Sequence, residues 1–115
     1  MIRRSDEQAI EFKCIRNGIG ETRMLKLLDG ADEMNGKGRM FNLMRIEPGN
    51  SIGEHTHTGD SEVFYFLKGS GEYTDDGTVI HVNPGDVAIC PDGHSHALKN
   101  TGSEPLEFIA LILYA

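Results

Sequence analysis

The sequence predicts an all-β domain in which antiparallel strands form a sandwich or a barrel. Short runs of β-branched, aliphatic and aromatic residues alternate with clusters of Gly, Pro, Asn and Asp about every ten residues, a pattern typical of such folds. Glycine accounts for 14 of the 115 residues, which indicates many tight turns. A chain of this length corresponds to a single domain, residues 1–115, with one hydrophobic core.

Nine strands are expected along the chain, each bounded by turn residues. They cover residues 22–28, 40–47, 53–57, 62–68, 71–74, 78–82, 87–90, 96–100 and 106–114. The clearest turn is Asp76-Gly77, because this dipeptide between two strand patterns is a strong signal for a β-hairpin. Residues 29–38 are rich in Gly, Asp and Asn and predict one long loop.

Two of these strands, residues 62–68 and 106–114, are apolar on both faces. Successive strand residues point to opposite sides of a sheet, so Phe64 and Phe66 share one face while Val63, Tyr65 and Leu67 share the other. The barrel interior accounts for only one of these faces. We therefore expect a homodimer in which a second copy covers the other face, the alternative being that the N-terminal residues cover it within one chain.

Composition excludes several classes of function. The formal net charge of −7 disfavours nucleic acid as a partner, because an acidic surface repels phosphates. No apolar run is long enough to span a bilayer, and the first residues lack the apolar core of a signal peptide. Cys14 and Cys90 are far apart and are expected to be free thiols. The expected location is the cytoplasm, with no membrane partner.

Three histidines and one glutamate form the pattern with the most chemical content. His55 and His57 are two residues apart, so on a strand their imidazoles lie on the same face. Glu62 follows a turn that is expected to return the chain as an antiparallel neighbour facing this pair, and His96 adds a third imidazole from a later strand. Such a set suits a divalent transition metal: Mn, Fe, Co, Ni or Zn. His81, alone between apolar neighbours, is interpreted as a hydrogen-bonded or solvent-facing side chain without a role in the site.

The residues around these four resemble the two signatures of the cupin superfamily. The first signature, G-x5-H-x-H-x4-E-x6-G, is met by Gly49, His55, His57, Glu62 and Gly69. The second, G-x5-P-x-G-x2-H-x3-N, is met by Gly85, Pro91, Gly93, His96 and Asn100. The resemblance implies a conical jelly-roll β-barrel of two antiparallel sheets, over about residues 22–115, with the metal held by the four residues named above. Residues 1–21 would then be an N-terminal arm or an edge strand.

The predicted site favours small anionic ligands. Three neutral imidazoles and one carboxylate leave a divalent ion with a net charge of about +1, and a metal that prefers six ligands keeps positions for substrate oxygens. The expected pocket wall is apolar, although plain core packing is the alternative for its members, which are Phe64, Phe66, Met40, Met44 and Ile46.

Two kinds of function remain open for a small cupin. The first is a metal-dependent dioxygenase, isomerase or lyase acting on a small oxygen-rich anion, with the ion as Lewis acid or oxygen activator. The candidates for proton transfer are His94, Glu54 and Tyr65. The second is a binding module that senses or stores a metal or small ligand without turnover.

Overall fold

The structure is a computed structural model that describes residues 1–115. It contains ten strands and one short 3-10 helix, η1 (Ser5–Glu7). The strands are β1 (Ile10–Lys13), β2 (Thr22–Leu28), β3 (Gly38–Ile46), β4 (Ser51–Thr56), β5 (Asp60–Lys68), β6 (Gly71–Asp75), β7 (Thr78–Val82), β8 (Val87–Cys90), β9 (Ser95–Lys99) and β10 (Leu106–Tyr114).

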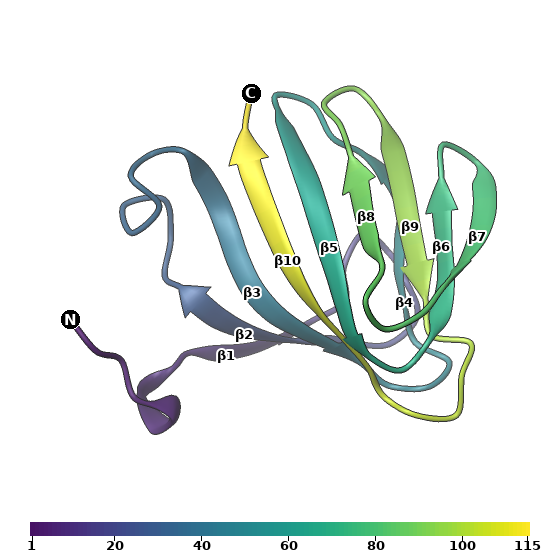
Figure 1. Ribbon diagram of the computed structural model, residues 1–115, viewed down its shortest axis with the longest axis horizontal. Coiled ribbons are helices and arrows are strands. Elements are labelled where there is room, and N and C mark those ends of the chain that lie inside the picture. The colour runs from purple at the N-terminus through teal and green to yellow at the C-terminus, as the bar shows by residue number, and fades with distance from the viewer.

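The strands form two antiparallel sheets that face each other (Figure 1). One sheet has six strands in the order β1-β2-β3-β10-β5-β8, and the other has four in the order β4-β9-β6-β7. Without β1 and β2, each sheet has four strands, and the chain passes between the sheets as in a jelly roll. The predicted all-β class with two antiparallel sheets is therefore confirmed.

All nine predicted strands agree with the structure within two residues at each end. The Asp76-Gly77 turn joins β6 to β7 as expected, and both residues have positive φ, 46° and 87°. Strand β1 was not among the nine predicted strands. It pairs with β2 at the edge of the six-stranded sheet, and all four of its residues are exposed, so no buried alternation marks it in the sequence.

The expected hairpin between the two halves of the first motif is wrong. Strand β4 belongs to the four-stranded sheet and pairs with β9, whereas β5 belongs to the six-stranded sheet and pairs with β10 and β8. The segment between them crosses from one sheet to the other. Glu62 therefore faces His55 and His57 across the space between the sheets, and no ladder joins their strands.

The inward faces of the two sheets enclose the core. Its largest members are aromatic residues of the six-stranded sheet, and Phe64, Phe66 and Phe108 are at most 2% exposed. Phe108 packs on both other rings, with centroid separations of 4.7 Å to Phe64 and 5.7 Å to Phe66. Phe64 also stacks on the ring of His96, so the aromatic core directly supports one of the predicted site residues.

The segment between β1 and β2 attaches to the exposed edge of β4. Gly53 donates its N–H to the carbonyl of Ile15, and Ser51 donates to that of Ile19. The two backbones approach so closely that a Cβ at Gly53 would lie 1.9 Å from the Arg16 carbonyl oxygen. The N-terminal residues therefore link the two sheets beside the predicted site. No helix in the chain is long and apolar enough to cross a membrane.

Candidate metal centre

The four predicted ligands converge on one point between the sheets. His55 comes from β4, His57 follows it directly, Glu62 lies on β5 and His96 on β9. One ligand atom from each residue lies within 4.8 Å of the others. The Nε2 atom of His96 is 3.1 Å from Nε2 of both His55 and His57 and 3.0 Å from Oε1 of Glu62. His57, Glu62 and His96 are buried, and the side chain of His55 is nearly so.

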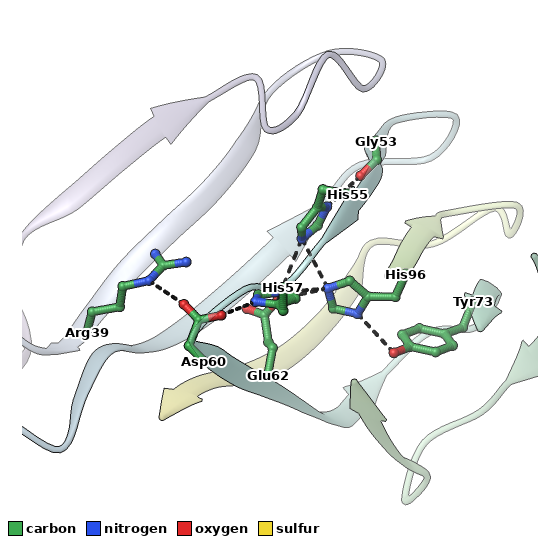
Figure 2. A network of polar contacts seen from close by, with 8 residues as sticks. All are labelled: Arg39, Gly53, His55, His57, Asp60, Glu62, Tyr73 and His96. Carbon is green, nitrogen blue, oxygen red and sulfur yellow. Dashed lines mark hydrogen bonds and ion pairs between the residues drawn. The ribbon is translucent and has the colours of Figure 1, made fainter. Parts of the chain in front are cut away.

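Each imidazole is held through its other ring nitrogen (Figure 2). Nδ1 of His55 is 2.8 Å from the carbonyl oxygen of Gly53, and Nδ1 of His57 is 2.7 Å from Oδ1 of Asp60. Nδ1 of His96 is 2.9 Å from the hydroxyl of Tyr73. A carbonyl and a carboxylate only accept hydrogen bonds, so in the neutral state Nδ1 of His55 and His57 carries the proton.

This pattern leaves electron-rich atoms facing one another. With the proton on Nδ1, Nε2 of His55 and Nε2 of His57 each present a lone pair, and both lie close to Nε2 of His96 and to the Glu62 carboxylate. Such an arrangement requires either protons or a cation at its centre. Histidines that ligate a metal commonly donate the other N–H to a carboxylate or carbonyl in this way. The donor set, three nitrogens and one oxygen, therefore fits a divalent transition metal.

The pKa values of the clustered side chains depend on two opposing effects, burial and hydrogen bonding within the cluster. The hydrogen bond with Glu62 raises the pKa of His57, whereas burial lowers that of His55. Burial acts to raise the pKa of Glu62, but its hydrogen bonds with His57 and His96 outweigh burial and hold it below the usual value. Glu62 therefore stays ionised, and its negative charge attracts whichever cation occupies the centre.

A cavity of about 220 Å³ opens beside the cluster. His55, His57 and Glu62 form part of its wall, so the candidate ligands are accessible from it. Three of the five predicted pocket residues also line it, namely Phe64, Met40 and Met44. The other two, Phe66 and Ile46, lie in the core with no exposed surface, so plain packing is the better account of them.

None of the three candidates for proton transfer lines this cavity. Tyr65 is 43% exposed on the outer side of β5, opposite to Phe64 and Phe66. Glu54 is exposed on β4, where the irregular pairing between Ile52 and His55 turns it outward. His94 is half-exposed in the loop before β9, where it pairs with Asp76. The geometry therefore gives no support to an acid–base role for these residues.

Several residues of the site were not predicted from the sequence. Asp60 and Tyr73 hold two of the histidines, and three basic residues, Lys13, Arg16 and Arg39, line the cavity. Asp60 was recognisable only as a turn residue, and Tyr73 as a strand residue. The basic residues come from β1, the following segment and β3, and no periodicity in the sequence brings these segments together.

The fold and this cluster define a class of protein: a small jelly roll with a three-histidine, one-glutamate centre. A model of the cupin domain matches residues 42–112. The chain belongs to the cupin family, which confirms the resemblance seen in its two motifs.

The chain is similar to a protein that is described as a binding protein and to others that are described as enzymes. An oxalate-binding protein of Thermotoga maritima is 40% identical over 114 residues, which are 98% of this chain and 93% of that protein. A crystal structure of a predicted oxalate decarboxylase from the same organism superposes with a TM-score of 0.93 over the whole of both chains, at 39% identity. A 5-nitrosalicylic acid 1,2-dioxygenase of Bradyrhizobium is 26% identical over 76% of this chain, which spans only 38% of that enzyme.

Proposed function

We propose that this cupin binds one divalent transition metal through His55, His57, Glu62 and His96 and uses it to bind a small dicarboxylate. The observation that carries the proposal is that each of the three histidines has a polar partner at Nδ1. These contacts direct the three Nε2 atoms toward the buried carboxylate of Glu62. When bound, the metal would supply Lewis acidity and open positions for the oxygens of a ligand.

The cavity favours a ligand of only a few heavy atoms. A volume of about 220 Å³ equals roughly seven water molecules, since each water occupies about 30 Å³ of liquid. A two-carbon dicarboxylate such as oxalate fits this volume, and the similarity to an oxalate-binding protein supports the same ligand.

Reversible binding is the activity that the cavity residues support best. Apart from the metal ligands, its wall contains apolar side chains and three basic ones, and no carboxylate or histidine is left as a general acid or base. Turnover is the second candidate, favoured by the similarity to a structure described as a predicted oxalate decarboxylase. In that case oxalate would lose carbon dioxide and take up a proton to become formate.

Calorimetry of the metal-loaded and metal-free chain with oxalate tests the proposal. We expect saturable binding with a stoichiometry near one, present only with metal. Equal binding without metal, or none with it, would contradict the proposal. Measurement of formate and carbon dioxide in the same samples distinguishes the two candidates, because a binding protein consumes no oxalate whereas a decarboxylase releases both products.

We also propose that the chain forms a homodimer through the outer face of the six-stranded sheet. One row of apolar residues crosses all six strands in register: Ile10, Leu25, Leu43, Ile109, Tyr65 and Val87. Strand β1 extends this face at the sheet edge and does not cover it. An apolar surface that spans a whole sheet is typical of an interface.

Light scattering at micromolar concentration tests the dimer. We expect a mass of about twice the 12.7 kDa of the chain. Val87→Asp should produce monomers, whereas the control Val79→Asp, at a similarly exposed position on β7, should not. A monomeric parent protein would contradict this proposal. The cytoplasmic location stays a prediction, and fractionation of cells that contain the protein tests it.

A further inference from the structure

The cavity is basic in a chain that is otherwise acidic. Lys13, Arg16 and Arg39 line it, and Glu62 is its only acidic lining residue, although the formal net charge of the chain is −7. Glu62 also belongs to the candidate ligand set, so its charge is offset whenever a cation occupies the centre. The three basic residues are exposed, so they stand where the cavity meets solvent.

Arg16 is held at the cavity at a conformational cost. Its φ of 53° lies in the left-handed region, which glycine adopts far more readily than arginine. Hydrogen bonds on either side fix the segment on β4, and the Arg16 carbonyl packs against Gly53, two residues before His55. The following residue, Asn17, has a φ of 58°, and Gly18 donates its N–H to the Ile15 carbonyl, so a tight turn places Arg16 at the cavity.

Arg39 has donors left for a ligand. Its Nε atom lies 3.0 Å from Oδ2 of Asp60, whose other oxygen is bonded to His57. The two terminal nitrogens of Arg39 form no hydrogen bond within the protein, and Figure 2 shows them directed away from Asp60. A guanidinium fixed at one nitrogen presents its remaining N–H groups in a defined direction, and this geometry suits a carboxylate.

We infer that Lys13, Arg16 and Arg39 form an anion subsite that binds the carboxylate oxygens of the ligand facing away from the metal centre. This inference rests on the proposed function. It names the groups that select a dianion over a monoanion of the same size. Oxalate and glycolate each have two carbons and can present one oxygen from each carbon to a metal. Only oxalate keeps a carboxylate oxygen on both carbons for the subsite.

Isothermal titrations of the metal-loaded full chain with oxalate and with glycolate test the subsite. Arg16→Gln and Arg39→Gln should each weaken oxalate binding by about tenfold, since each removes charge-assisted hydrogen bonds, and should change glycolate binding by less than about threefold. The control Arg23→Gln, on β2 and outside the cavity, should change neither. The metal affinity of Arg16→Gln should equal that of the parent, which separates loss of the subsite from damage to the centre.

The outcomes distinguish failure of the subsite from failure of the proposed function. If the parent protein binds oxalate but both variants keep the parent ratio of oxalate to glycolate affinity, the subsite is overturned while the proposed function stands. This holds whether both affinities are unchanged or both weaken equally, because in either case the residues do not discriminate charge. If the metal-loaded parent binds neither acid, the proposed function fails and the subsite fails with it.

Discussion

The hydroxyl of Tyr73 lies 2.9 Å from Nδ1 of His96, inside the core and away from solvent. This single contact fixes which ring nitrogen of His96 faces the other histidines. Burial raises the pKa of the tyrosine, so its hydroxyl stays protonated. If Nε2 of His96 ligates a metal, Nδ1 carries the ring proton and donates it to this hydroxyl oxygen.

Tyr73→Phe should weaken metal binding by about 10- to 100-fold, the usual effect of removing a partner that orients a ligand. The reason is that His96 would lose its only Nδ1 partner in a buried position. Competition with a fluorescent chelator measures the affinity. Tyr65→Phe is the matched control, because that hydroxyl lies on the outer side of the sheet. Equal affinities for the two variants would show that Tyr73 does not position His96.

Replacement of Gly53 by alanine should lower stability by about 1–3 kcal/mol, the usual cost of forcing extra atoms into a packed site. The added Cβ would lie 1.9 Å from the Arg16 carbonyl oxygen, which belongs to the backbone and cannot rotate away. Denaturant unfolding measures the change. Gly102→Ala serves as the control, since its Cβ would meet no atom nearer than 3.5 Å. A Gly53→Ala variant as stable as the control would contradict the close approach of the two segments.

Only one of the two thiols should react with Ellman's reagent in the folded protein. Cys14 is exposed, whereas Cys90 is buried, and burial raises the pKa of the Cys90 thiol to about 11. The thiolate is the reactive form, so Cys90 stays inert near pH 8. The folded Cys14→Ser variant should release almost no thionitrobenzoate and should react after unfolding in guanidinium. Rapid reaction of the folded variant would place Cys90 at the surface.

The stabilisation that metal confers should shrink as the pH falls from about 8 to 5, because ligation requires neutral imidazoles. The pKa of His57 is raised by its hydrogen bond with Glu62, so protons compete for this position at a higher pH than for an isolated histidine. A raised pKa also means that the His57 contribution to the stability of the metal-free chain is present at low pH and lost as the pH rises through that pKa. Both effects reduce the metal-induced rise in Tm on acidification.

Melting curves with and without metal across this pH range measure the difference directly. His55 acts in the opposite sense in the metal-free protein, because burial lowers its pKa and its protonation then destabilises the fold. The comparison is therefore made between loaded and metal-free samples at each pH. A metal-induced rise in Tm that is constant from pH 8 to 5 would contradict histidine ligation.

The sequence alone was sufficient for the convergence of His55, His57, Glu62 and His96, because their spacing follows two specific motifs and strand alternation. It was also sufficient for most strands, since turn residues mark their ends. It did not reveal that β4 and β5 lie in opposite sheets, because a short turn-rich link between two strands is compatible with either a hairpin or a crossover. That choice depends on how all ten strands pair.

The pocket wall was predicted only in part for a related reason. Phe64 and Phe66 share one face of β5, so alternation treats them alike, yet only Phe64, the one nearer to Glu62 along the strand, lines the cavity. How deep a strand residue lies in the barrel depends on tertiary packing, and alternation along a single strand does not indicate it. The same holds for Arg16, whose position depends on the pairing of its segment with β4.

Elemental analysis of the purified chain tests the central claim most directly. The parent protein, loaded with manganese, iron, cobalt, nickel or zinc and then desalted, should retain one metal ion per chain. His57→Ala and Glu62→Gln should retain far less while remaining folded by circular dichroism. His81→Ala, an exposed histidine on β7, should retain as much as the parent. Retention of one ion per chain by folded His57→Ala and Glu62→Gln would contradict the metal centre proposed for this cupin.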